Sequence, residues 1–318
     1  MTSLYILFMF NIYSMNRLKR RGEGSDQSCL DVMEHILEVQ HVSKTFKNFH
    51  LDDVSLSVRK GFIMGFIGPN GAGKSTLIKC IMDFIPYEQG TVKLFGKTHE
   101  EATREIKDRI GFVADENIYF DHLTIEGNKK LVAPFYSQWS DSSFYAYLDK
   151  FGLNRKQKVK SLSKGMKMKM ALAFVLSHEA ELIIMDEPTA GLDPVFRREL
   201  LDILLEVIQD ENKAIFFSTH ITTDLESIAD YIAMINNGRI VFSKEKDELL
   251  DHFQIVKGPT EIVDEVKSHL IHVRKTAVGF EALTEKGALL REQYGDHFSF
   301  EKPTLDQIMY FFVKEKAQ

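Results

Sequence analysis

The alternation of apolar and polar residues changes several times along the chain, and each change indicates a different kind of element. Residues 37–41 and 54–58 alternate apolar with polar positions, which predicts half-buried antiparallel strands. Nearly continuous apolar runs predict strands buried on both faces of a parallel sheet, at 62–67, 110–114, 182–185, 214–218 and 231–235. Because helical patterns separate these runs, we predict an α/β fold with an antiparallel β subdomain and a helical insertion at about 116–180.

The same pattern divides the chain into three parts. Residues 1–32 show no pattern that would pair their apolar residues, so we expect a disordered tail or a translation-start artefact, with a short interfacial anchor as the alternative. Residues 33–245 contain the α/β core. From 246 to 318 the runs become short and mixed, which predicts a small α+β accessory domain. Its expected elements are strands at 253–256 and 271–278 and helices near 261–269 and 305–314.

The composition is that of an ordinary folded protein, with 44% hydrophobic and 27% charged residues. A formal charge of −6 argues against a nucleic-acid-binding protein, which usually carries a basic face. No apolar run reaches the roughly 18 residues that a membrane-spanning helix needs. If this protein acts at a membrane, it therefore needs a separate spanning partner.

The strongest chemical motif follows the apolar run at 62–67 and opens a helical stretch. It consists of Gly68, Pro69, Asn70, Gly71, Ala72, Gly73, Lys74, Ser75 and Thr76, which fit the pattern G-x-x-x-x-G-K-[ST]. Gly71 and Gly73 let successive N–H groups turn inward as a nest for phosphates, and the helix N-terminus adds partial positive charge. We expect Lys74 to reach the outer phosphates and Ser75 to hold Mg²⁺, so the motif predicts a site for ATP.

A second motif places two adjacent carboxylates at the end of the buried run at 182–185. Asp186 and Glu187 follow this predicted strand, and ligands of α/β sheets bind at the carboxyl ends of strands. We expect Asp186 to hold Mg²⁺ through water and Glu187 to polarise the attacking water as the general base. Together with the phosphate loop, this pair predicts hydrolysis of ATP.

With these motifs, residues 35–245 resemble the ATP-binding cassette of ABC transporters, a P-loop NTPase fold. Residues 162–166, Leu-Ser-Lys-Gly-Met, resemble the family signature Leu-Ser-Gly-Gly-Gln. The resemblance implies that Ser163 and Gly165 bind the γ-phosphate held by the phosphate loop of a second cassette. Lys164 and Met166 depart from the signature, and a plain helix N-cap is the alternative role for Ser163.

The resemblance extends to three further positions. Asp193, in Gly-Leu-Asp-Pro, matches the loop that crosses the dimer seam, and His220 matches the histidine that contacts the γ-phosphate and the attacking water. Phe46 matches the aromatic ring that stacks on adenine. The alternatives are a structural role for His220 and a core position for Phe46.

The largest departure from the family lies at residues 111–115, Gly-Phe-Val-Ala-Asp, where the family has Gly-Tyr-hydrophobic-Pro-Gln. The family's Gln ligates Mg²⁺ and senses the γ-phosphate. The resemblance assigns this role to Asp115, which offers a charged oxygen at that place. Glu116 could fill the role instead, and Asp115 as a plain loop carboxylate is the third interpretation.

The resemblance implies an ATPase that drives a transmembrane permease, with ATP and Mg²⁺ as cofactors. Two cassettes, identical or not, would close head to tail around ATP while bound to the cytoplasmic face of the cell membrane. Residues 115–117, 162–166 and 303–309 resemble bacterial bacitracin- and drug-export-like ATPases, which implies export. The alternatives are a soluble ABC ATPase without a permease, and a cassette that binds ATP as a switch without turnover.

Overall fold

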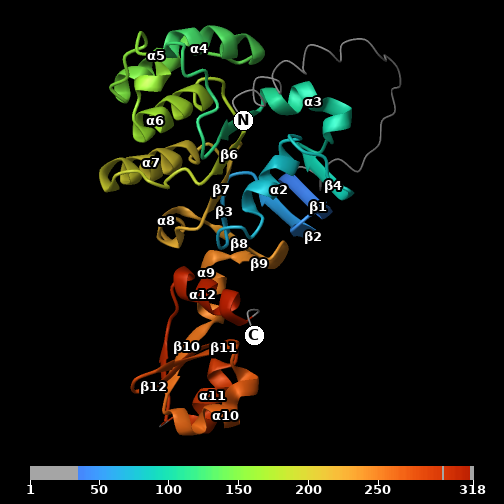
Figure 1. The fold of residues 1–318 in the computed structure, drawn as a ribbon, viewed down its shortest axis with the longest axis vertical. Helices are drawn as coiled ribbons and strands as arrows, with labels where there is room; N and C mark the ends of the chain where they lie inside the picture. Colours follow the sequence, from blue (N-terminus) through green and yellow to red (C-terminus); the bar gives the residue numbers. More distant parts are fainter. Residues whose placement is uncertain (1–34, 296, 316–318) are drawn as a thin grey trace.

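The structure is a computed structural model that describes residues 35–295 and 297–315, so the tail expected at residues 1–32 lies outside the described residues. Three sheets organise the chain, with helices packed around them (Figure 1). The α/β fold predicted from the apolar pattern is confirmed. Every helix in the described parts of the chain is too short or too polar to cross a bilayer.

A six-stranded sheet forms the centre of the cassette, with strand order β5-β6-β7-β3-β8-β9. Its strands are β3 (Ile63–Ile67), β5 (Ile110–Val113), β6 (Leu182–Asp186), β7 (Ala214–Thr219), β8 (Tyr231–Asn236) and β9 (Arg239–Glu245). The first five in spatial order run parallel and β9 pairs antiparallel with β8. Every residue of β3, β5, β6 and β7 is buried, as the continuous apolar runs predict.

The parallel register brings the carboxyl ends of four neighbouring strands to one edge of this sheet. Asp186 at the end of β6 pairs with Ser218 of β7, and Ile67 at the end of β3 pairs with Thr219. On the other side of β6, Val113 of β5 pairs with Met185. The segments that leave β3, β5, β6 and β7 therefore start side by side, and they carry most of the predicted site residues.

A three-stranded antiparallel sheet, in the order β2-β1-β4, stands beside the central sheet. Its strands are β1 (His35–Phe46), β2 (Phe49–Arg59) and β4 (Gln89–Leu94). The two predicted strands extend into one long hairpin, in which Phe46 and Phe49 flank the turn. The hairpin is longer than the alternating segments indicate because the ladder continues to Phe46 and Phe49, where the side chains of Thr45 and His50 also meet at 3.0 Å.

Helices cover the sheets and build a separate helical region. The helices of the cassette are α2 (Lys74–Ile81), α3 (His99–Asp108), α4 (Ile125–Val132), α5 (Asp141–Lys150), α6 (Lys164–Val175), α7 (Pro194–Val207) and α8 (Thr222–Ile228). Figure 1 shows α4, α5 and α6 grouped together at one end of the molecule. Thr124 caps α4 as predicted, since its Oγ1 accepts a hydrogen bond from the Gly127 N–H. The rings of Phe144 and Phe174, 4.9 Å apart, join α5 to α6.

Just beyond the end of α6, His178 ties this helical region to the central sheet. Its Nδ1 lies 3.0 Å from the carbonyl oxygen of Phe174, and its Nε2 lies 3.2 Å from that of Ile110 at the start of β5. The ring stacks on Tyr136 at 3.8 Å. Burial lowers the pKa of His178, because the charged imidazolium would lose its hydration; the two carbonyl contacts oppose this shift.

This buried histidine predicts a loss of stability in mild acid. Above about pH 6.5, the ordinary His pKa, both the folded and the unfolded chain carry a neutral His178. As the pH falls below that value the unfolded chain binds a proton that the folded chain resists, so the free energy of unfolding decreases. Denaturant titrations between about pH 5 and pH 7 should show a shallower decrease in His178→Gln than in the parent chain. His122→Gln, at an exposed position, is the control; an unchanged slope in His178→Gln would contradict the prediction.

The C-terminal part folds around its own antiparallel sheet, in the order β11-β12-β10-β13. Its elements are α9 (Lys246–His252), β10 (Gln254–Gly258), α10 (Val263–Val266), β11 (His272–Thr276), β12 (Gly279–Thr284), α11 (Gly287–Tyr294), β13 (Ser299–Glu301) and α12 (Leu305–Glu315). A small core gathers Val256, Phe280, Leu290 and Phe298. The sheet lies at the opposite end of the molecule from α4–α6, while α12 turns back toward α9 and the cassette (Figure 1). There the Leu305 N–H donates to Glu226 Oε1 of α8 at 2.7 Å.

Two element predictions in this part were wrong in detail. The strand expected at 271–278 ends at Thr276, and a turn leads directly into β12. Val278, 94% exposed, stands in that turn, and Gly279 follows with φ of 147°. The single helix expected near 261–269 is divided between α10 and the 3₁₀ segments η4 (Thr260–Ile262) and η5 (Lys267–His269). The helix at 305–314 is present as α12.

Candidate functional site

The loop between β3 and α2 has the backbone conformation that its glycines predict. Gly71 and Gly73 have φ of 78° and 115°, in the left-handed region that favours glycine. Gly73 is also the N-cap of α2, so the first N–H groups of this helix face the loop. The Lys74 side chain is buried and reaches back across the loop, where its Nζ donates to the carbonyl oxygens of Gly68 at 2.7 Å and Pro69 at 3.3 Å. The loop thus presents converging N–H donors and a lysine ammonium group.

Three predicted catalytic residues meet at the adjacent strand ends. Glu187 follows β6 with φ of 51°, and its N–H donates to the Ser218 carbonyl oxygen at 2.9 Å. Its Oε1 lies 3.3 Å from Lys74 Nζ, and its Oε2 lies 2.7 Å from His220 Nδ1. The His220 backbone N–H also donates to Oε2, at 3.2 Å. The buried Glu187 carboxylate is therefore held between the phosphate-loop lysine and the histidine that follows β7.

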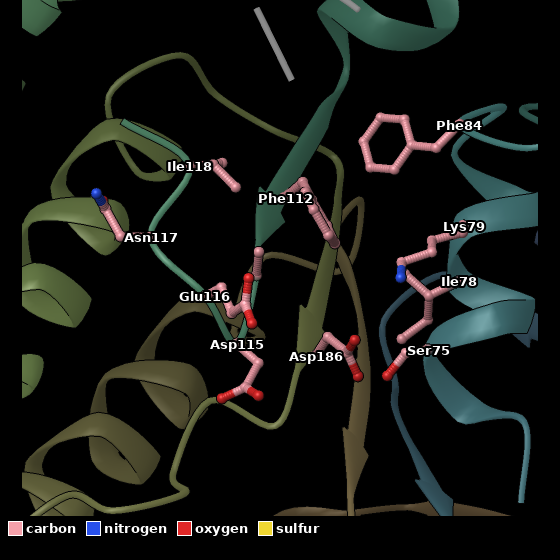
Figure 2. Close-up of a pocket in the computed structure, with 11 residues that line it drawn as sticks. Ser75, Ile78, Lys79, Phe84, Phe112, Asp115, Glu116, Asn117, Ile118 and Asp186 are labelled. Atoms are coloured by element: carbon pink, nitrogen blue, oxygen red, sulfur yellow. The ribbon is translucent and has the colours of Figure 1, made fainter. Parts of the chain in front are cut away.

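Asp186 faces Ser75 across the start of α2 (Figure 2). Burial raises the pKa of Asp186, and the charges of Glu187 and Asp115 add to the effect, while the hydroxyl groups of Ser75 and Ser218 act against it. Its buried Oδ1 has no hydrogen-bond partner among the described residues. A buried carboxylate oxygen of this kind needs a cation or a donor, because an unsatisfied buried acceptor is costly.

These residues fit a magnesium ion. Across residues 35–295 and 297–315, no three His, Cys, Asp or Glu side chains gather into a metal cage. Magnesium sites in ATPases need none, since Mg²⁺ is usually held by one or two protein oxygens together with water and substrate phosphates. Ser75 Oγ and the unpartnered Asp186 Oδ1 would supply the two protein oxygens.

A cavity of about 220 Å³ opens beside this pair, between α2 and the segment that follows β5. Phe84 and Phe112, with rings 5.6 Å apart edge to face, form part of its apolar wall. Asp115, Glu116 and Asp186 contribute carboxylates to its lining (Figure 2). Since both Asp115 and Glu116 line the cavity, each remains a candidate for the role of the family's Gln.

The signature-like residues begin α6. Ser163 is its N-cap, with Oγ accepting a hydrogen bond from the Met166 N–H at 3.2 Å. Gly165 lies in the first turn, where a Cβ would come no closer than 3.7 Å to Phe196. No hydrogen bond or ion pair within the described ranges joins Ser163 or Gly165 to residues 68–76. The chain itself therefore does not bring its signature and its phosphate loop together.

Asp193 has a similar place at the start of α7. Its Oδ1 accepts hydrogen bonds from the N–H groups of Val195, at 3.1 Å, and Phe196, at 3.0 Å. Pro194 occupies the first helical position, where it needs no hydrogen-bond donor. Asp193 is thus a helix cap, and its predicted role at a dimer seam stays a prediction.

Phe46 lies on the surface at the end of β1. Its side chain is 43% exposed, so the alternative of a core aromatic is wrong. Lys44 Nζ lies 5.6 Å from the ring centroid, and the Phe49 ring lies 6.4 Å away. The position leaves a π-face open to a ligand, as stacking on a base requires.

Sequence reasoning missed two residues that touch this site. Ser218 contributes a buried hydroxyl beside Asp186. The signal that could have identified it is the pairing of β6 with β7, which places Ser218 next to Asp186. Lys164 was noted only as a departure from the signature. Its Nζ lies 3.3 Å from Asp115 Oδ1, and nothing in the local sequence pattern predicts that contact.

Comparisons with known proteins agree with this geometry. The family model for ABC transporter proteins matches residues 51–190. The lantibiotic transport ATP-binding protein SrtF of Streptococcus pyogenes is 34% identical over 215 residues, which cover 67% of this chain and 92% of that protein. The bacitracin transport ATP-binding protein BcrA of Enterococcus faecalis is 32% identical over 221 residues, covering 69% and 72%.

Solved structures give the same result. The structure of an ATP-binding subunit of an ABC transporter is 28% identical, with a TM-score of 0.63, and the match covers 68% of this chain and 92% of that one. A dimeric ATP-binding cassette bound to ADP and phosphate shares the fold, with 22% identity and a TM-score of 0.60. The chain therefore belongs to the ATP-binding proteins of ABC transporters, as an ATP-binding ATPase similar to the bacitracin and lantibiotic transport proteins of that family.

Proposed function

We propose that this chain is the subunit that powers an ABC exporter through ATP-driven pairing of two cassettes. The observation that carries the proposal is the constellation of Lys74, Glu187 and His220 beside Asp186. The four residues come from three neighbouring buried strands, since Lys74 follows β3, Asp186 and Glu187 stand at the end of β6, and His220 follows β7. Their polar groups converge on the loop that would cradle the phosphates. A structural turn would need no such convergence of buried charges.

The distances suggest how each side chain acts. Lys74 would exchange the Gly68 carbonyl oxygen and the Glu187 carboxylate for the outer phosphates of ATP. Glu187, released on that side, would then accept a proton from the attacking water as the general base, while His220 Nδ1 keeps its carboxylate in place. Mg²⁺, held by Ser75 and Asp186, with Asp115 as a further candidate, would neutralise charge on the transferred phosphoryl group.

The placement of the signature supports a second cassette. Ser163 and Gly165 lie at the N-terminus of α6, which offers N–H donors and partial positive charge suited to a phosphate. Among the described residues, however, no hydrogen bond or ion pair joins them to residues 68–76 of the same chain. Two cassettes packed head to tail would place each signature against the partner's nucleotide, with Asp193 at the seam and Phe46 on adenine.

Export is proposed from the relatives, which are named for bacitracin and lantibiotic transport. The proposed partner, a membrane-embedded permease, follows from the same relatives, which are named as ATP-binding proteins of transport systems. The proposed complex would place this chain at the cytoplasmic face of the membrane. Whether the second cassette is identical to the first is a separate question that the same preparation can answer.

A co-expression experiment tests this proposal. When the chain is produced together with a candidate permease, a membrane protein chosen from the genes that neighbour its own, we expect it to sediment with membranes and to co-purify with that permease in mild detergent. Without the permease it should stay in the supernatant. Production with an unrelated permease of the same size is the control. Equal recovery in the supernatant with and without the permease would instead favour an ABC ATPase that works without a membrane partner.

A further inference from the structure

Two residues that depart from the family pattern, Lys164 and Asp115, are in contact with each other. Lys164 stands where the signature has Gly, and Asp115 stands where the loop after β5 has Gln. Lys164 Nζ lies 3.3 Å from Asp115 Oδ1, although the residues are 49 positions apart in the chain. Each position thus has a charged residue in place of an uncharged one, and the two charges are opposite.

Asp115 stands at the boundary between two environments. In this conformation its carboxylate points away from Ser75 and Asp186 (Figure 2) and pairs with Lys164. It nevertheless lines the same cavity as Ser75 and Asp186, and its charge contributes to the raised pKa of Asp186. If this one side chain rotated, its carboxylate would leave the ammonium group of Lys164 and enter the site beside Asp186.

Lys164 is equally well placed to change partner. It is the first residue of α6, directly after Ser163, so its ammonium group lies beside the helix N-terminus that the proposed dimer presents to a phosphate. Its side chain also passes the loop before α7, within 3.7 Å of the Cβ position at Gly191. A nucleotide phosphate reaching this end of α6 would attract Lys164 away from a single carboxylate.

The ion pair itself is weak enough to exchange. The side chains of Lys164 and Asp115 are 49% and 47% exposed, so water screens their attraction and the pair contributes little to stability. A divalent cation carries twice the charge of a lysine, so it attracts Asp115 more strongly at the same distance. Both members of this ion pair can find a new partner at the same time, Asp115 in a metal ion and Lys164 in a phosphate. Such a pair is better suited to a switch than to a purely structural role.

We propose that Lys164 holds the Asp115 carboxylate away from the Ser75–Asp186 site, and releases it to the metal–nucleotide complex when Lys164 pairs with a phosphate bound by a second cassette. This inference rests on the head-to-tail dimer proposed above. It assigns Lys164 a positioning role and explains why the two departures occur together. Loading of Asp115 would be coupled to dimer closure, because one lysine controls both.

A second ion pair provides a matched control. Lys167, one turn further along α6, contacts Asp121 Oδ1 at 3.1 Å. This pair joins the same helix to the same segment after β5 and is similarly exposed at the carboxylate. Asp121 also accepts a hydrogen bond from Asn117 Nδ2 at 3.0 Å and does not line the cavity with Ser75. Neutralising it should disturb the packing of the segment without changing the charge at the nucleotide site.

The test is a double-mutant cycle in the Glu187→Gln background, so that binding is measured without hydrolysis. Asp115→Asn, Lys164→Gln and the double variant are compared with the background chain. Sedimentation with ATP and Mn²⁺ gives the dimerisation constant, and electron paramagnetic resonance of free Mn²⁺ gives the affinity of the metal. We expect Asp115→Asn to lower the affinity of the undimerised chain for Mn²⁺ by roughly tenfold, because the metal loses a carboxylate ligand, and Lys164→Gln to raise it, because the ammonium group no longer holds Asp115. Lys164→Gln should weaken dimerisation by roughly tenfold, since its contact with the partner's phosphate is lost. In the Asp115→Asn chain, Lys164→Gln should leave the affinity for Mn²⁺ unchanged within about threefold, because no carboxylate remains to be released.

The outcomes separate this inference from the dimer proposal. If the Glu187→Gln background does not dimerise with ATP, the dimer proposal is wrong and this inference falls with it. If it dimerises but Lys164→Gln lowers the affinity for Mn²⁺, changes that affinity equally with and without the Asp115 carboxylate, or has no effect, only the Lys164–Asp115 exchange is wrong. Lys167→Gln and Asp121→Asn should alter both constants by less than about threefold. A control cycle as strongly coupled as the tested one would reduce the effect to general packing and overturn the proposal.

Discussion

Replacing Glu187 with Gln is expected to lower ATP turnover by about 10²–10⁴-fold while ATP binding is retained. Glu187 is the buried carboxylate that Lys74 and His220 hold at the end of β6. A Gln side chain has the same shape and still accepts a hydrogen bond from His220, but it cannot take a proton from water. The chain should therefore bind ATP and stop before hydrolysis, and the proposed dimer should accumulate because its bridging nucleotide persists.

Phosphate release and sedimentation in the presence of ATP measure the two halves of this prediction. Glu206→Gln on α7 is a suitable control, because the Glu206 side chain is 70% exposed and contacts only Lys150 among the ion pairs of the described chain. Its turnover should match that of the parent. Hydrolysis by Glu187→Gln at the parent rate would remove Glu187 from the mechanism, whereas loss of ATP binding would indicate that its contact with Lys74 shapes the phosphate loop.

The central sheet was predictable because its information is local. A strand buried on both faces needs an unbroken apolar run, and the runs at β3, β5, β6 and β7 are followed directly by chemical motifs. The phosphate loop is local in the same sense, since its glycines have the left-handed φ that the motif requires. The apolar pattern and the chemical motifs thus indicate the same edge of the same sheet.

Other features depend on contacts between distant residues, and the local pattern does not contain them. The start of the hairpin from β11 to β12 was read as one strand, because Thr276, the last residue of β11, and Val278, inside the turn, both have strand-forming side chains. The division of the 261–269 helix into short segments follows from packing on a small core. One local signal was available but unused: Asp193 followed by Pro194 is a helix start, and α7 begins there.

The site shows the same limit. Asp115 was predicted as a candidate ligand from its position in the family pattern, but its contact with Lys164 could not be predicted from spacing. The contact depends on how α6 lies against the segment after β5, which His178 and the ion pair of Lys167 help to fix. The departures from the family pattern are informative only once the fold places them side by side.

Mixing two inactive variants should restore activity if each ATP is held between two chains. Lys74→Ala damages the phosphate loop, and Ser163→Arg places a bulky side chain where the signature faces a nucleotide. In a mixed head-to-tail dimer both lesions fall on one composite site, and the other site contains an intact Lys74 and an intact Ser163. We expect each variant alone to be nearly inactive and an equal mixture to recover about a quarter of the parent activity, since half of the randomly paired dimers contain one intact site.

Three controls protect this experiment against trivial results. Lys74 is buried beside Glu187, so its removal leaves a buried charge without its partner, and thermal unfolding must show that Lys74→Ala is folded. Ser163→Thr keeps the N-cap of α6 and should remain active, which separates loss of the cap from a block at the nucleotide. Mixing Lys74→Ala with a chain that carries both substitutions leaves no intact site, and this mixture should stay inactive. If the first mixture also stays inactive although mixed dimers are demonstrated, Ser163 and Lys74 do not act on the same ATP across two chains, and the head-to-tail arrangement is wrong.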